Sequence, residues 1–176
     1  MTSQRHCRWW TGILLVAGAC ASPQAAPRAA GGSVAAVDGA ARPPRISVAA
    51  FRQLRWLEGR WRGDQPDGNP FFEGYRFEND STIRSYTYAD SVTRVAADSG
   101  AIVLRGGEVT TGSERASWAA SGLTATRIEF VPRAGARNSF VWEKSSPDSW
   151  TATLRWPATA DRPAREVVYP MRRLSP

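Results

Sequence analysis

Glu73 is the residue of this sequence whose position calls for a chemical explanation. It lies in a segment of alternating residue types, where Phe71, Tyr75 and Phe77 share its strand face. Burying a lone carboxylate costs free energy, so such a group must be paired, protonated or in contact with water. Arg84 or Arg105 on neighbouring predicted strands could pair with it. The alternative is that Glu73 turns outward into a surface ion pair.

Aromatic side chains are numerous enough to surround a bound molecule. The chain has eight tryptophans, and two of them, Trp9 and Trp10, lie in its first ten residues. A polar group among aromatic walls would hold an amphipathic ligand by its head and cover its apolar body. The residues predicted to bind such a ligand are Glu73, Tyr75, Tyr86, Trp118, Trp142, Trp150 and Tyr169. The alternative is that these large rings simply fill the interior.

Several chemistries are excluded by composition. His6 is the only histidine, and Cys7 and Cys20 are the only cysteines. The sequence after Cys20 therefore offers no His-bearing triad, thiolate nucleophile, haem histidine or zinc site with nitrogen or sulfur ligands. It also lacks the glycine-rich nucleotide-binding motifs. We expect no cofactor, no metal and no assigned catalytic residue, and the open enzymatic alternative is a cofactor-free isomerase or cyclase that uses Glu73 and Tyr75.

The elements that would position these residues are short β-strands. Runs rich in β-forming residues alternate with turn signals every 8–12 residues. The predicted strands are Gly59–Gly63, Phe71–Glu78, Thr82–Asp90, Ala101–Gly106, Glu114–Ala120, Thr124–Val131, Asn138–Lys144, Ser149–Trp156 and Arg165–Leu174. Before them, the spacing of Phe51, Leu54 and Leu57 predicts a short helical turn. We therefore predict an all-β fold, an antiparallel up-and-down barrel of about 8–10 strands, because closure removes exposed strand edges.

The two ends of this region carry a further pattern. Gly59-Arg60-Trp61 follows the helical turn, and Met171-Arg-Arg-Leu174 closes the last strand. This layout resembles lipocalins and their calycin relatives, and with Phe71–Phe77 and Tyr169–Arg173 it is similar to a bacterial lipocalin-like family of unknown function. The resemblance implies that Gly59 permits a tight turn, that Trp61 closes one end of the barrel and that Arg173 lies over Trp61. The alternative is that Arg172 and Arg173 are solvated charges near the end of the chain.

The N-terminal segment has the pattern of an export signal. Arg5 and Arg8 precede an apolar run that is too short to span a bilayer as a helix. Val16-Ala-Gly-Ala-Cys20 resembles the lipobox of bacterial lipoproteins, which implies lipidation of Cys20; ordinary signal cleavage is the alternative. We predict a signal peptide at 1–19, a flexible Ala/Pro/Gly-rich tether at 20–47 and a barrel domain at 48–176.

Charge and location complete the expectation. The formal net charge is +7, and Lys144 is the only lysine among 23 basic residues. The arginines are scattered and interleaved with acids, so we expect no nucleic-acid partner. The sequence predicts a protein on the periplasmic side of the outer membrane, or free in the periplasm, that binds a small apolar or amphipathic molecule. A structural envelope barrel without a ligand remains the alternative, and oligomeric state is left open.

Overall fold

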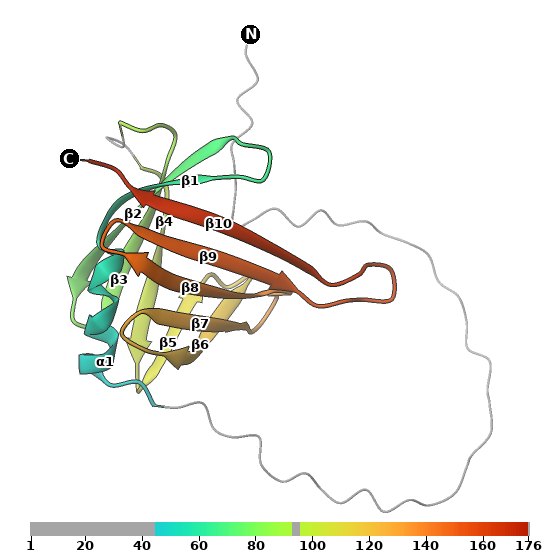
Figure 1. Ribbon diagram of the computed structural model, residues 1–176. Helices are drawn as coiled ribbons and strands as arrows, with labels where there is room; N and C mark the ends of the chain where they lie inside the picture. The colour runs from blue at the N-terminus through green and yellow to red at the C-terminus, as the bar shows by residue number, and fades with distance from the viewer. Residues whose placement is uncertain (1–44, 93–95, 176) are drawn as a thin grey trace, which may run out of the picture. The chain divides into compact units, whose positions relative to one another are not determined.

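The computed structural model describes residues 45–92 and 96–175, and within them ten antiparallel strands close into a barrel (Figure 1). Each strand pairs with its neighbours in sequence, and β10 returns to pair with β1. The strands are β1 (Gly59–Asp64), β2 (Pro70–Asn79), β3 (Thr82–Tyr88), β4 (Ala96–Arg105), β5 (Glu108–Gly112), β6 (Ser117–Leu123), β7 (Arg127–Pro132), β8 (Ser139–Ser146), β9 (Ser149–Trp156) and β10 (Arg165–Arg173). The predicted up-and-down barrel is confirmed.

A short helical segment precedes the barrel, as expected. α1 (Val48–Arg52) continues into the 3-10 helix η1 (Gln53–Leu57). The Ser47 hydroxyl accepts a hydrogen bond from the Ala50 N–H at 3.1 Å and caps the first turn. Phe51, Leu54 and Leu57 are fully buried, so their spacing of three residues places one apolar stripe against the barrel.

The ordered domain begins earlier than the predicted tether allowed. Ile46 is buried, and its N–H donates to the Gly107 carbonyl at 2.8 Å. With the Ser47 cap, this contact shows that the last residues assigned to the tether at 20–47 belong to the folded domain. The rest of the predicted tether lies outside the described residues.

Strand prediction was wrong at β4, β5 and β6. β5 (Glu108–Gly112) was missed because Val109 is its one large apolar residue. Asp98-Ser-Gly100 precedes the predicted strand Ala101–Gly106 but lies inside β4, and Ser121-Gly122 separates two predicted strands but lies inside β6, at a register shift between Ala120 and Gly122. Hydrogen bonding to two neighbours overrides the weak strand preference of these small and polar residues.

The barrel has two different ends. At the closed end, connections of two or three residues join β2 to β3, β4 to β5, β6 to β7 and β8 to β9, and the buried stripe of α1 and η1 packs there. At the open end, connections of four to eight residues join β1 to β2, β3 to β4, β5 to β6, β7 to β8 and β9 to β10. In Figure 1 the helix lies on one side and the long β9–β10 hairpin extends to the other.

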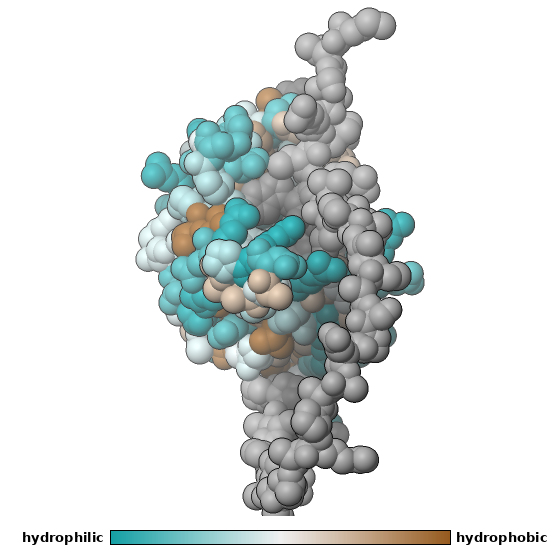
Figure 2. Space-filling model, turned by 90° about the vertical axis from the view of Figure 1, so that its right-hand side faces the viewer, coloured by the Kyte–Doolittle hydropathy of each residue, from teal (hydrophilic) through white to brown (hydrophobic). Residues whose placement is uncertain are grey.

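The interior follows the alternation of the strands. Inward positions carry large apolar side chains, and Trp61, Trp150, Phe130 and Met171 are at most 1% exposed. Figure 2, which faces the side where the β9–β10 hairpin ends, shows a largely hydrophilic surface with a few scattered hydrophobic residues. No helix among the described residues is long and apolar enough to cross a membrane.

Candidate functional site

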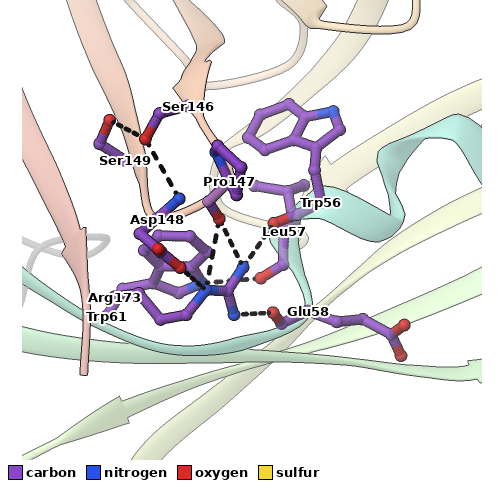
Figure 3. A network of polar contacts seen from close by, with 9 residues as sticks. All are labelled: Trp56, Leu57, Glu58, Trp61, Ser146, Pro147, Asp148, Ser149 and Arg173. Carbon is purple, nitrogen blue, oxygen red and sulfur yellow. Dashed lines mark hydrogen bonds and ion pairs between the residues drawn. The ribbon is translucent and has the colours of Figure 1, made fainter. Parts of the chain in front are cut away.

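The closed end is held by the residues predicted for that role. The Arg173 guanidinium lies 4.2 Å from the centre of the Trp61 ring (Figure 3). It donates to the carbonyls of Glu58 at 2.7 Å and Pro147 at 3.1 Å, and to the Asp148 carboxylate at 3.1 Å. One guanidinium thus joins the segment before β1, the β8–β9 turn and the end of β10. This arrangement is structural, because its donors are occupied by the protein's own acceptors.

Gly59 is required in this arrangement for two reasons. Its φ of +124° is a conformation that residues with a Cβ rarely adopt. A Cβ at this position would also lie 2.3 Å from Nη1 of Arg173. Trp61 is fixed in turn by its indole N–H, which donates to the Leu57 carbonyl at 2.7 Å. The Gly59-Arg60-Trp61 segment therefore stabilises the closed end in two ways: the Gly59 backbone leaves room for Arg173, and the Trp61 ring packs against its guanidinium group.

The middle of the barrel is filled by aromatic rings. Trp150 makes edge-to-face contacts with Trp61, Tyr75 and Trp142, at centroid distances of 5.9, 6.0 and 5.6 Å. Such pairs contribute beyond the area they bury. Trp142 and Trp150, predicted to bind a ligand, thus pack mainly against other rings, and the same holds for Trp118, which contacts Phe140 at 5.7 Å. Trp142 and Trp150 form the floor beneath any site at the open end, whereas Trp118 lies near that end itself, where its indole N–H donates to the Asn138 carbonyl of the β7–β8 connection at 2.7 Å.

Above this floor, Glu73 lies on the inner wall. Cross-strand pairing places it beside Trp61 of β1 on one side and Thr87 of β3 on the other. The Tyr75 hydroxyl donates to Oε2 of Glu73 at 2.6 Å. Burial raises the pKa of Glu73 to about 7, and the hydrogen bond from Tyr75 offsets part of that rise. A carboxyl group with this pKa exchanges its proton near neutral pH, so it can serve as a donor, an acceptor or an anion.

The cationic partners expected for Glu73 are wrong. Arg84 faces outward and forms a two-point ion pair with Glu78, at 2.9 and 3.0 Å. Arg105 is exposed at the end of β4. The outward alternative for Glu73 is equally wrong, since its neighbour Trp61 points into the core. Within residues 45–92 and 96–175, the recorded partner of the Glu73 carboxyl is the Tyr75 hydroxyl, and no salt bridge to it occurs.

Polar residues continue the inner wall toward the open end. Thr87 pairs in register with Asp98 of β4, and Ser85 pairs with Gly100, so all four positions share the inner face with Glu73. Glu73, Ser85 and Thr87 are partly exposed, and Asp98 is exposed. The inner wall therefore changes from fully buried aromatic rings at the closed end to an acidic, accessible strip near the mouth.

Two of the predicted ligand-binding residues require separate comment. Tyr169 lies on the inner face of β10 and contacts Phe71 edge to face at 5.9 Å, so it forms part of the apolar wall. Tyr86 was predicted to line the interior, and this is wrong. It pairs with Gly74 on the outer face, where Arg76 donates to its hydroxyl at 3.3 Å. The alternation of β3, with Ile83 buried, gives the correct face.

Sequence reasoning also missed part of the strip. Asp98 lay outside the predicted strands, and Ser85 and Thr87 were not considered as site residues. The parity of Ile83, Ser85 and Thr87 within β3 is the signal that identifies the two β3 residues. Among the described residues, no cluster of three or more His, Cys, Asp or Glu could hold a metal ion. The arrangement can instead hold a polar or cationic group at Glu73 against an apolar floor.

Comparisons with known proteins assign no role to the residues of this site. No protein-family model matches the chain, and no curated protein matches it significantly. A solved structure titled EF1p2_mFAP2b bound to DFHBI shares 10% identity, with a TM-score of 0.37, over 71% of this chain and 99% of that one. A likeness at that level assigns no role to any residue of this barrel.

Proposed function

We propose that this protein binds a small amphipathic molecule at the open end of its barrel, with the polar head of the ligand at Glu73. The observation that carries the proposal is that Glu73 is partly exposed on the inner wall, with its carboxyl bonded to the hydroxyl of the buried Tyr75. Burial of a carboxyl group without a cation destabilises the folded protein. A ligand that hydrogen-bonds to this group would offset that cost.

The charge of the wall favours a cationic or hydrogen-bond-donating head. Glu73 and Asp98 both lie on inward positions, whereas the arginines of the neighbouring strands lie on outward ones. Those outward residues are Arg60, Arg62, Arg76, Arg84 and Arg105. An ammonium head at Glu73 would therefore also be attracted by the Asp98 carboxylate two strands away, and its apolar body would contact Tyr169, Phe71 and the aromatic floor.

A titration with matched probes tests this function. Dodecylamine, dodecanol and dodecanoate share one chain length and differ in the charge of the head, and tryptophan fluorescence reports contact with the floor. We expect the amine to bind most tightly at pH 8, where Glu73 is mostly ionised. Glu73→Gln should weaken amine binding at least about tenfold, the effect of losing one charge-assisted hydrogen bond.

A matched variant serves as the control for the Glu73→Gln titration. Glu78→Gln changes an outward acid on the same strand and should leave amine binding unchanged. If none of the three probes binds the wild type, or if Glu73→Gln binds the amine as well as the wild type does, the barrel is a filled structural domain.

We also propose that the protein is exported as a lipoprotein of the lipocalin-like class. The support is the pattern of residues 1–20 and the pairing of Gly59, Trp61 and Arg173 at the closed end. Cys20 lies outside the described residues. Two acyl chains would hold the domain on a bilayer, because each buried methylene contributes about 0.8 kcal/mol. Cys20→Ser should move the protein to the soluble fraction, and an N-terminal peptide without acyl mass would contradict the proposal.

A further inference from the structure

Two buried hydrogen-bond donors have no acceptor where η1 packs against the start of β9. They are the indole N–H groups of Trp56 and Trp150, and neither meets an acceptor within residues 45–92 and 96–175. The Trp150 side chain is 1% exposed, and the nitrogen atoms of both rings are shielded from solvent. Buried N–H groups are nearly always paired, because a donor that loses water without gaining a partner destabilises the folded state. Two such donors therefore indicate a bound acceptor.

The two unpartnered donors belong to neighbouring rings. Trp56 and Trp150 meet edge to face, with centroids 6.1 Å apart and an interplanar angle of 65°. Trp61, which also contacts Trp150, differs from them because its N–H donates to the Leu57 carbonyl at 2.7 Å. In Figure 3 the polar network around Arg173 includes the carbonyl of Trp56, and no contact is drawn to its indole nitrogen. The protein thus satisfies the polar groups around this ring pair but leaves the two N–H groups open.

The only lysine of the chain lies beside this ring pair. Lys144 of β8 pairs in register with Trp150, which places both residues on the inner face of the barrel. Lys144 is half-buried, and its ammonium group has no ion-pair partner in the part of the chain that the structure describes. The neighbouring acids are engaged elsewhere: Asp148 binds Arg173 at 3.1 Å, and Glu143 forms an ion pair on the outer face. The charge that a ligand would meet here is therefore positive.

These groups fit a halide ion better than a water molecule. A water that accepts two N–H hydrogen bonds must still donate two of its own, and it would find mainly ring edges, which carry partial positive charge. A halide accepts hydrogen bonds from any direction and donates none. A carboxylate or phosphate would bring further oxygens for which no additional donor is present in this part of the described structure. The ligand expected from the donors is thus a single anionic atom.

We propose that the closed end binds a halide ion, such as chloride, between Nε1 of Trp56 and Nε1 of Trp150, with Lys144 as its counter-charge. This site uses donors that the amphipathic ligand proposed above does not use, so the two proposals can fail separately. An ion held by both N–H groups would join η1 to β9. Halide binding should therefore stabilise the folded protein, because the unfolded chain does not bring the two rings together.

A crystal soaked in sodium bromide tests the position of the ion directly. Bromide replaces chloride in such a site and is identified by its anomalous scattering. We expect one anomalous peak within hydrogen-bonding distance of the indole nitrogens of Trp56 and Trp150. No peak there, or density for a water molecule that bromide does not replace, would overturn the proposal.

Unfolding in solution measures the affinity and assigns it to the two N–H groups. The thermal midpoint is followed while bromide replaces gluconate at constant ionic strength, and it should rise with bromide concentration. Trp56→Phe and Trp150→Phe keep an aromatic ring but remove the N–H, so each should weaken bromide binding at least about fivefold. Trp56 is only partly buried, so its variant should remain folded even if Trp150→Phe loosens the core. Trp156→Phe, at the far end of β9, is the control and should respond to bromide as the wild type does.

A second pair of variants tests the counter-charge. Lys144→Gln should weaken bromide binding about threefold, the effect of one partly screened charge. Arg172→Gln removes an exposed charge from the outer face of β10 and should leave binding unchanged. An equal loss in Arg172→Gln would show that bromide responds only to net charge. Equal stabilisation of the wild type, Trp56→Phe and Trp150→Phe would show a general salt effect, and either result would overturn the proposal.

Discussion

The two ends of this barrel are made by the same ten strands of the described chain, yet their charged groups differ in how many partners the protein gives them. At the closed end, the Arg173 charge lies on an indole ring and is bound to backbone carbonyls and one carboxylate. On the side of Trp61 that faces the open end, the Glu73 carboxyl accepts a hydrogen bond from the Tyr75 hydroxyl. A charge with several fixed partners stabilises a fold, whereas a carboxyl with one neutral partner leaves binding capacity for something else.

The difference follows from connection length and packing. Two- and three-residue turns, together with the helix, bring carbonyl groups close to Arg173. The four- to eight-residue connections of the open end leave Thr87 and Asp98 accessible on inward positions. Stability therefore depends most on the closed end, and adaptation to a ligand depends most on the open end. Substitutions at the two ends should separate these contributions.

The largest effect is expected from Trp61→Ala. It removes a fully buried ring from the closed end, which costs about 3–5 kcal/mol in the free energy of unfolding. Arg173→Ala should also destabilise, and the double variant should cost about 1–2 kcal/mol less than the sum of the single effects. Urea unfolding at pH 7 measures all three.

Arg172→Ala is the matched control for that cycle. Arg172 is exposed and pairs with Arg62 on the outer face, so its loss should change stability by less than about 0.5 kcal/mol. Strict additivity of Trp61→Ala and Arg173→Ala would show that the guanidinium group and the indole do not interact energetically.

The second effect concerns pH. Glu73 has a folded-state pKa of about 7 against an ordinary value of 4.5, so the folded state binds the proton more tightly than the unfolded state. The stability of the wild type should therefore fall as the pH rises from about 4.5 to 7, and the loss should be complete above that range. Glu73→Gln removes this dependence and keeps an acceptor for Tyr75. Its stability relative to the wild type should rise by up to about 3 kcal/mol between pH 4 and pH 8.

Urea unfolding at several pH values from 4 to 8 measures this difference. Glu78→Gln is the control, because the ion pair with Arg84 lowers the pKa of Glu78. The stability of Glu78→Gln relative to the wild type should therefore change with the opposite sign: it should fall as the pH rises through the acid range, because the wild type gains the Glu78–Arg84 ion pair there. A constant stability difference between Glu73→Gln and the wild type would show that Glu73 titrates as an exposed acid.

The closed end was more predictable from sequence than the open end. Gly59, Trp61 and Arg173 are recognisable because a glycine at positive φ, a plugging ring and a terminal arginine each leave a distinct residue type at a fixed place. The inward face of β2 followed from alternation in the same way. Residue type at a fixed place and the two-residue period of a strand were sufficient to predict these features from the sequence.

The cross-strand neighbours of Glu73 could not be obtained by the same means. Tyr75 lies two residues away on the same face, but Thr87 and Asp98 depend on the register of β3 and β4, which is set by turns and by bulges at Phe77/Asn79 and Thr87/Tyr88. A shift of one residue moves every side chain to the other face. Tyr86 was placed inside although the alternation of β3 from the buried Ile83 turns it outward, and Asp98 lay between two predicted strands, in a segment that the hydrogen-bonded ladder makes part of β4.

A third effect should distinguish conformational strain from steric overlap at the closed end. Gly59→Ala and Gly68→Ala both place a Cβ at a positive φ, with values of +124° and +82°. The Cβ at Gly68 meets nothing within 4 Å, whereas that at Gly59 meets Arg173. We expect a loss of about 1 kcal/mol at Gly68 and about 2–3 kcal/mol at Gly59. Equal losses in urea unfolding would mean that Arg173 moves aside at no cost.

The smallest effect on stability is expected at the open end. Asp98 is exposed, and its carboxylate accepts a short-range hydrogen bond from the Ser99 N–H at 2.7 Å. Asp98→Asn keeps an oxygen acceptor, so the free energy of unfolding should change by less than about 0.5 kcal/mol. The affinity for dodecylamine at pH 8 should nevertheless fall about threefold, because one of the two inward carboxylates is lost and an exposed charge contributes less than about 1 kcal/mol. Raising the salt concentration to 1 M should reduce this difference, since exposed charges are screened over a few ångströms. A variant that loses stability but binds dodecylamine like the wild type would show that Asp98 belongs to the scaffold, and the functional contrast between the two ends would then depend on Glu73 alone.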